Sequence, residues 1–218
     1  MNFEPATTLT EQIADHLGAE IISGRLKPAT RIQELKVAGE LGVSRGSVRE
    51  ALLILEARHL IEIVPRRGAV VSAMESKEIV DFYEVYSGLQ MLCYARLAEQ
   101  ENPDLDAARA ALGAMRAAVA AEDDDGVLKA RGDYLLGSLA AVRSHYLCSV
   151  LRNLVPAGLR VARMADAHPA YDARDTVRYH QALLDAVLGH EEERVRELVR
   201  AFHGREVRLV LGCSTIDG

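Results

Sequence analysis

The sequence contains no tryptophan and only three cysteines, and aromatic residues make up only 5% of its 218 residues. Cys93, Cys148 and Cys213 are far apart and lack Cys-x-x-Cys spacing, so we expect reduced thiols and no disulfide framework. No apolar run reaches the roughly 18 residues of a membrane span, and no charged-then-apolar signal pattern opens the chain. We therefore expect a soluble, cytoplasmic protein with no membrane partner.

Several motifs of common catalytic sites are also missing. The sequence has no His-Glu-x-x-His segment, no P-loop and no glycine-rich dinucleotide motif. An enzyme would need a nucleophile with its base, a pair of carboxylates or an open metal site. We therefore expect that the protein is not an enzyme.

The net charge of −6 is unevenly distributed. The first 72 residues contain nine lysines and arginines and nine acidic residues, so the excess acidity lies in the remainder of the chain. A chain of this length exceeds what one small domain requires. We expect a domain at 1–72, a linker at 73–76 and a second domain at 77–218.

Residues 43–51 have the pattern of a helix that lies in the major groove of DNA. Ser44 is a suitable cap for a helix that begins at the next residue. At 100° per residue, one face of this helix is apolar and Arg49 lies away from it, with Arg45 at the border. A guanidinium fits guanine or phosphate, and the small residues Gly46 and Ser47 allow a close approach to the duplex. An ordinary amphipathic helix with solvated arginines is the alternative.

The flanking segments favour a winged helix-turn-helix. A capping box at Thr8–Glu11 opens a helix with an apolar residue at every fourth position, and a short helix at 33–41 ends at Gly42. Downstream, two β-branched runs at 60–64 and 69–71 predict a hairpin. Its tip carries two arginines, which we expect to meet a phosphate or the minor groove.

Three segments together resemble the DNA-binding domain of GntR-family transcriptional regulators. They are Ile22–Pro28, Leu41–Leu52 and Pro65–Val71, and the similarity covers about residues 8–72. The resemblance implies that Arg45, Ser47, Arg49 and Gly68 occupy positions used against bases or phosphates. With the cap and the wing, the candidate DNA-binding residues are Ser44, Arg45, Gly46, Ser47, Arg49, Arg66, Arg67 and Gly68.

Two positions depart from the pattern of that family. Ala29 stands where the family usually has glycine after proline, and Arg58-His59 replaces an acidic residue followed by glycine. Neither position lies on the face expected to meet DNA. They put the geometry of two turns in question more than the function.

The second domain has the pattern of an antiparallel helical bundle, so the fold class is mainly α, with an N-terminal winged helix-turn-helix. Alanine, leucine, glutamate and arginine dominate it, and no strand-like alternation occurs. We expect Pro156 to kink or interrupt the fourth helix. The expected helices lie at 76–101, 104–121, 124–142, 145–167, 173–189 and 191–211.

The order and length of these helices resemble the ligand-binding (FCD) domain of the FadR-type subgroup of the GntR family. In many members an Asp-x-x-x-His pair joins histidines of later helices to hold a divalent metal, which helps to bind a carboxylate. Here the pairs 131/135, 132/136 and 133/137 all lack that combination. His180 matches a ligand position, whereas the last ligand position falls on Phe202, next to His203. We expect no tightly bound metal; weak binding through the two histidines stays open.

The resemblance also implies a homodimer that binds a pseudo-palindromic operator on double-stranded DNA. Since the basic excess at 44–68 is small, we expect two copies to act together. We expect a repressor that responds to a small metabolite, a carboxylate by analogy with the family; the alternative is a bundle that only dimerises. For His180 the choice between pocket and core stays open. The candidate effector-pocket residues are Tyr86, Gln90, Asp133, Tyr134, His180 and His203.

Overall fold

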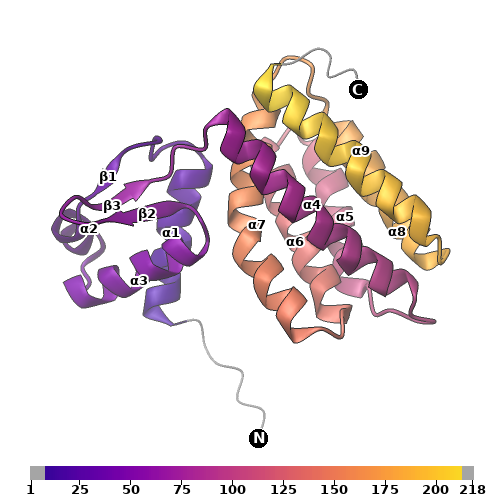
Figure 1. Ribbon diagram of the computed structural model, residues 1–218, viewed down its shortest axis with the longest axis horizontal. Helices are drawn as coiled ribbons and strands as arrows, with labels where there is room; N and C mark the ends of the chain where they lie inside the picture. Colours follow the sequence, from indigo (N-terminus) through magenta and orange to yellow (C-terminus); the bar gives the residue numbers. More distant parts are fainter. Residues whose placement is uncertain (1–7, 213–218) are drawn as a thin grey trace, which may run out of the picture. The chain divides into compact units, whose positions relative to one another are not determined.

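The computed structural model describes residues 8–212, so Cys213 lies outside the described residues. The contacts divide the chain into two compact units that meet along the sequence at Met74 and Glu75. Within these described residues the first unit contains three helices and three short strands, and the second is built from helices (Figure 1). The predicted fold class is confirmed: a winged helix-turn-helix followed by a helical bundle.

The first unit follows the order expected from the caps and the periodicity. Thr8 and Glu11 form the predicted capping box, and Gly42 ends the second helix in the left-handed conformation. The elements are α1 (Leu9–Ile22), β1 (Arg31–Ile32), α2 (Glu34–Leu41), α3 (Arg45–Ala57), β2 (Ile61–Val64) and β3 (Gly68–Val71).

The three strands form one antiparallel sheet in the order β1-β3-β2. The predicted hairpin pairs Val64 with Gly68 and Ile61 with Val71. Strand β1 was not predicted: it has two residues, too few to show alternation, and it pairs Arg31 with Val70. This third strand covers the free edge of β3.

The core of the first unit lies between α1, α3 and the sheet. Helix α1 contributes Ile13, Leu17 and Ile21, which are almost fully buried. From α3, the predicted apolar face contributes Val48, Ala51, Leu52 and Leu55, each at most 2% exposed. Burial of such a side chain is worth about 1.5 to 3 kcal/mol, so this core fixes the rotation of α3 about its own axis.

The two departures from the family pattern lie in turns with a left-handed backbone. Ala29 has φ 61° and His59 has φ 57°. An L-residue pays about 1 to 2 kcal/mol for this conformation, which glycine adopts freely. The turns therefore keep a glycine-like geometry without the glycine.

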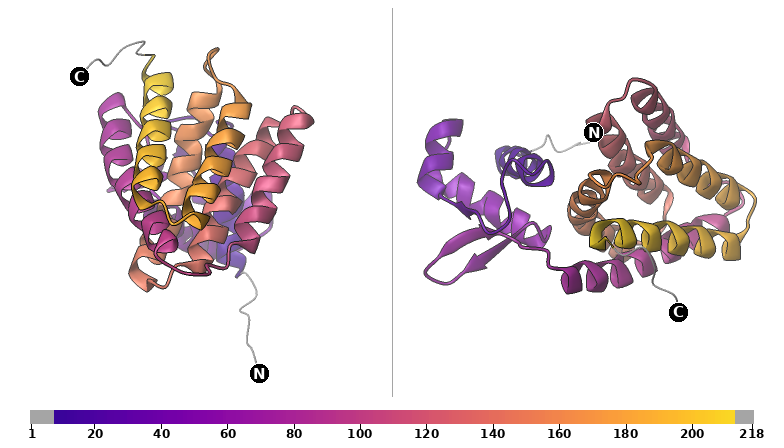
Figure 2. Two further views of the ribbon diagram at one scale, coloured as in Figure 1. Left: turned by 90° about the vertical axis from the view of Figure 1, so that its right-hand side faces the viewer. Right: turned by 90° about the horizontal axis from the view of Figure 1, so that it is seen from above.

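The second unit contains the six predicted helices. Each observed end lies within a few residues of the expected one. They are α4 (Ser76–Ala98), α5 (Asp106–Ala120), α6 (Asp124–Ala141), α7 (His145–Asp166), α8 (Ala173–Leu188) and α9 (Glu192–Leu211). In this unit α4 packs on α7 and α9, α5 packs on α6 and α8, and α8 lies beside α9 (Figure 2).

One part of the expectation about α7 is wrong. Pro156 does not interrupt the helix, which is continuous from His145 to Asp166, whereas a kink at this position stays a prediction. Proline has no backbone N–H, so the carbonyl of Arg152, four residues earlier, receives no helical hydrogen bond. Because Arg152 is exposed and Pro156 only partly buried, water can replace that donor. No helix within residues 8–212 is long and apolar enough to cross a membrane.

The left-handed turns generate a prediction about stability. Ala29→Gly and His59→Gly should each raise the free energy of unfolding of the first unit by about 0.5 to 1 kcal/mol, because glycine relieves the strain at positive φ. Urea unfolding measures the change. Ala19→Gly, at an exposed position inside α1, is the control and should lower stability by a similar amount. Destabilisation by all three substitutions would contradict the strain.

Candidate functional site

Helix α3 begins where the serine cap predicts. The Ser44 hydroxyl accepts a hydrogen bond from the backbone N–H of Ser47 at 3.0 Å, and the two hydroxyls lie 2.9 Å apart. Gly42–Gly46 also fits the Gly-x-Ser-x-Gly spacing of a hydrolase nucleophile elbow. That motif needs a strand before the serine, whereas here helix α2 precedes it. Ser44 is therefore a helix cap.

The two arginines of the first turns of α3 are exposed and share one partner. Arg45 Nε lies 2.8 Å from Glu34 Oε2, and Arg49 Nη2 lies 3.1 Å from the same oxygen. Hydrogen bonds from Arg49 and Arg45 lower the pKa of Glu34. Since Glu34 belongs to α2, both guanidinium groups are held at the exposed side of α3.

The β2–β3 turn presents Arg66 and Arg67, both exposed, at its tip. Arg66 has φ 65° and Gly68 has φ 80°, so the turn uses two left-handed residues. A Cβ atom at Gly68 would lie 3.9 Å from the guanidinium of Arg31. Strand β1 therefore brings a further arginine to the wing, which the sequence pattern did not reveal.

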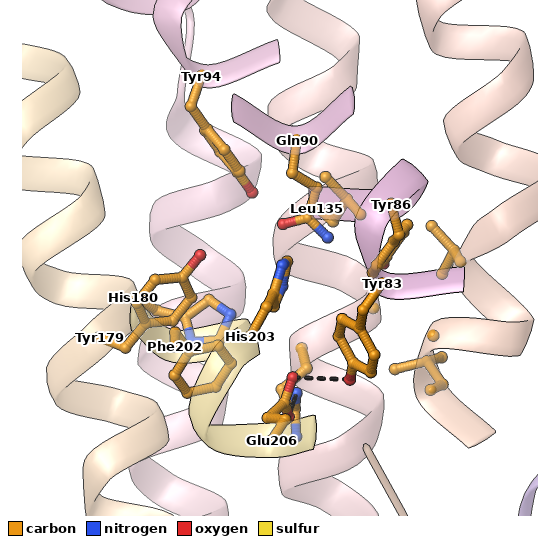
Figure 3. Close-up of a pocket in the computed structure, with 15 residues that line it drawn as sticks. Tyr83, Tyr86, Gln90, Tyr94, Leu135, Tyr179, His180, Phe202, His203 and Glu206 are labelled. Carbon is orange, nitrogen blue, oxygen red and sulfur yellow. Dashed lines mark hydrogen bonds and ion pairs between the residues drawn. The ribbon is translucent and has the colours of Figure 1, made fainter. Parts of the chain in front are cut away.

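A second candidate site is a cavity among the helices of the bundle (Figure 3). Its volume is about 40 Å³, room for a few water molecules. Four tyrosines, two histidines and one phenylalanine form much of its wall. Gly158 also lines it. Its missing side chain leaves room for the Tyr86 ring, because a Cβ there would lie only 2.8 Å from that ring.

A buried ion pair crosses one side of this cavity. Arg131 of α6 donates a hydrogen bond to Glu206 of α9, and the hydroxyl of Tyr83 donates to the same carboxylate at 2.9 Å. Asp166 of α7 lies 3.7 Å from Arg131 Nη1. Burial lowers the pKa of Arg131, but the charges of Glu206 and Asp166 outweigh it and raise the pKa above its usual range.

Stacked aromatic rings form another wall. Tyr179 of α8 and Phe202 of α9 lie parallel, with centroids 3.9 Å apart. The guanidinium of Arg131 lies 5.4 Å from the centre of the Phe202 ring, a cation–π distance. The buried hydroxyl of Tyr179 makes no hydrogen bond to residues 8–212.

The two cavity histidines are neutral at physiological pH. Burial lowers the pKa of His180 to about 3 and that of His203 to about 4. His180 Nδ1 lies 2.7 Å from the carbonyl of Thr176, which only accepts, so this nitrogen carries the proton. Its Nε2 is therefore an acceptor. His203 Nδ1 lies 2.8 Å from the hydroxyl of Ser87.

The structure brings four of the six expected pocket residues together. Tyr86, Gln90, His180 and His203 line the cavity. Asp133 does not: its carboxylate is half exposed and pairs with Lys129 on the surface, because it lies two positions beyond Arg131 on α6. Tyr134 is buried behind His180 and donates to its carbonyl at 3.1 Å instead of lining the cavity.

The other eleven of the fifteen lining residues were not among the expected pocket residues. Arg131 and Glu206 were missed because charged side chains are seldom buried, and a sequence pattern does not show that they pair. Tyr179 and Phe202 were not among the expected pocket residues, although the last ligand position of the family falls on Phe202. The pair Arg131 and Leu135 was one of three possible registers along α6.

The donor set does not fit a divalent metal. Arg131 and Leu135, one turn apart, both line the cavity at the positions where the resemblance would require Asp and His. A guanidinium cannot be a ligand and repels a cation. No group of three or more His, Cys, Asp or Glu within 8–212 is arranged to hold a metal ion. The expectation of no tightly bound metal stays a prediction.

The buried histidines make stability depend on pH. Below pH 6.5 the unfolded chain protonates both imidazoles, whereas the folded protein resists until about pH 3 to 4. Asp166 opposes this, since burial raises its folded pKa to about 6. Because two histidines act against one aspartate, the free energy of unfolding should fall by about 1 kcal/mol per pH unit from pH 6 to pH 4.

Urea unfolding of the helical unit across this range measures that slope. His180→Gln should flatten it, and His145→Gln, at an exposed position, should leave it unchanged. A stability that stays constant between pH 6 and pH 4 would contradict the neutral buried imidazoles.

Comparison with known proteins adds to this geometry. Residues 9–71 match the model of the bacterial regulatory proteins of the gntR family, and residues 81–203 match the FCD domain. The gluconate operon transcriptional repressor of Bacillus licheniformis is 36% identical over 94 residues, which cover 43% of this chain and 38% of that protein. The chain thus spans little more than a third of that relative.

Other similarities run over most of the chain. A protein of Paenarthrobacter nicotinovorans named "Probable D-xylose utilization operon transcriptional repressor" is 28% identical over 86% of this chain and 82% of its own. The solved structure of Escherichia coli McbR/YncC has a TM-score of 0.79 at 20% identity, covering 96% of this chain and all of the other, a likeness of fold. The matched family and these relatives are regulators and not enzymes. The chain belongs to the GntR family of bacterial regulatory proteins, in the group that carries an FCD domain.

Proposed function

We propose that the protein is a sequence-specific DNA-binding repressor of transcription that acts in the cytoplasm. One observation carries the proposal: Arg45 and Arg49 are exposed on a helix whose opposite face is sealed in a core. A helix held in this way can enter the major groove and present two guanidinium forks to base edges. The wing arginines, Arg66 and Arg67, would contact the phosphates beside it.

We also propose that two copies bind together. The first 72 residues carry no net charge, so one copy offers only a few cations to the phosphates. A homodimer doubles these contacts and matches a pseudo-palindromic operator, since a twofold protein calls for a twofold site. Its half-sites would be about one helical turn apart, or a multiple of it.

The bundle cavity is the proposed site of a small effector. Helix α4 contributes Tyr83, Tyr86 and Gln90 to it and begins just after the junction between the units. A ligand that binds differently in the DNA-bound and free arrangements would shift operator affinity. The relatives are named after gluconate and D-xylose operons, which suggests metabolites derived from carbohydrates.

A bundle that only dimerises is the second candidate. One observation favours it: the cavity holds a few water molecules, whereas ligand pockets usually measure about 300 to 1,000 Å³. An effector would have to displace wall residues. Failure of every small molecule to change operator affinity would favour this candidate.

Selection of bound DNA from a random pool tests the main proposal. The full chain should recover an inverted repeat, which would reveal the half-site sequence and the spacing together. Recovery of no common motif would contradict sequence-specific binding, and a single unpaired half-site would contradict the homodimer.

On the recovered operator, Arg49→Ala should weaken binding by about 1 to 3 kcal/mol if the guanidinium makes a bidentate base contact. A gel-shift titration measures the loss. Arg109→Ala, at an exposed arginine of α5, is the control and should leave affinity unchanged. If Arg49→Ala also leaves affinity unchanged, Arg49 does not contact bases.

Glu34 should matter for specificity more than for affinity. Glu34→Gln releases Arg45 and Arg49 from their common partner, so we expect tighter non-specific binding and a specific-to-non-specific ratio lower by about tenfold. Glu40→Gln, at an exposed glutamate of the same helix, changes the net charge equally and should preserve the ratio. Equal ratios for both variants would contradict a positioning role for Glu34.

A further inference from the structure

We infer that the bundle cavity binds an uncharged, hydroxyl-bearing ligand of the polyol or sugar class, without a metal, and discriminates against carboxylates. The inference rests on the proposed effector site and narrows its ligand. It also departs from the carboxylate that family resemblance favours.

The lining carries no free charge. Arg131 and Glu206 are its two charged residues, and they pair with each other. Burial keeps His180 and His203 neutral, and it raises the pKa of Tyr83, Tyr86, Tyr94 and Tyr179 so that the phenols stay protonated. The cation of the lining is already paired, so it would not neutralise an incoming carboxylate. Burial of an uncompensated charge is costly.

Asp166 adds to the cost for an anion. It lies 3.7 Å from Arg131 on the side of α7 and is itself buried, so Arg131 already faces two carboxylates. Burial raises the pKa of Asp166 to about 6, which leaves it mostly charged at pH 7. An incoming carboxylate would be the third negative group around one guanidinium.

The available polar atoms suit hydroxyl groups. The Tyr179 hydroxyl is buried and makes no hydrogen bond to residues 8–212, so it can donate to a ligand oxygen. Arg131 Nη1 also makes no hydrogen bond there, but it faces Asp166 at 3.7 Å. His180 Nε2 is an acceptor, by the tautomer fixed at Thr176. A hydroxyl group both donates and accepts and can satisfy such a mixed set, whereas a carboxylate only accepts. The rings of Tyr179 and Phe202 offer apolar contact to the carbon skeleton.

A ligand could reach the cavity past the stacked rings of Tyr179 and Phe202. Tyr179 and Phe202 line the cavity and also a more open groove between α8 and α9, so the stacked pair borders both spaces. The cavity alone is too small for a pentose. Rotation of this pair would join the cavity to the groove and make room without moving the ion pair.

The experiment compares matched pairs of compounds that differ in charge: glycerol with glycerate, D-xylose with D-xylonate, and D-glucose with D-gluconate. The full chain is treated with EDTA, and thermal shift and calorimetry measure binding at pH 7.5. We expect at least one neutral member to bind about tenfold or more tightly than its carboxylate partner. Equal or preferred binding of a carboxylate, binding that requires added metal, or no binding by any of the six compounds would overturn the inference.

Two variants test the residues. Tyr179→Phe removes a hydroxyl that makes no hydrogen bond within residues 8–212. The fold should therefore be kept, while affinity for the neutral ligand falls about three- to tenfold. Tyr146→Phe, at a tyrosine 84% exposed on the same unit, is the control and should change neither. Unchanged affinity in Tyr179→Phe would place the ligand elsewhere.

Glu206→Gln tests the charge argument directly. It leaves Arg131 with one carboxylate instead of two, so discrimination against the carboxylate partner should fall by about tenfold. Operator binding without ligand is measured in parallel. If the unmodified chain binds its operator but prefers the carboxylate compounds, only this inference is overturned. If the unmodified chain binds no operator, the proposed function is overturned.

Discussion

The buried ion pair of Arg131 and Glu206 is the interaction on which the helical unit depends. It joins α6 to α9, while Tyr83 and Asp166 attach α4 and α7 to the same charges. Loss of one partner of such a pair typically costs about 3 to 5 kcal/mol, because the other charge is left buried alone. The pair therefore fixes four helices around the cavity and also cancels the charge inside it.

This arrangement gives the cavity a physical connection to the rest of the chain. Tyr83, Tyr86 and Gln90 lie at successive turns of α4, and that helix begins immediately after the junction at Met74 and Glu75. A change in the contacts of these three side chains acts on the first helix of the unit. In the first unit, by contrast, the core formed by α1, α3 and the sheet fixes α3 locally.

The sequence predicted much of the fold, because its signals are local. Caps at Thr8 and Ser44, the glycine at 42 and the helical periodicity placed most helix ends within a few residues. The cavity was harder to predict, because three registers along α6 place different residues inward and only packing selects Arg131. Strand β1 is too short for any pattern, and α7 continues through Pro156 although a proline removes one helical hydrogen bond.

Gly158 has a consequence for how such a regulator can evolve. The ring of Tyr86 rests where a side chain at position 158 would stand. A single methyl group there would lie within 3 Å of that ring, so the tyrosine would have to shift in the wall of the cavity. At the proposed effector site, a single substitution at position 158 would thus change ligand binding, while α3 and its arginines stay intact.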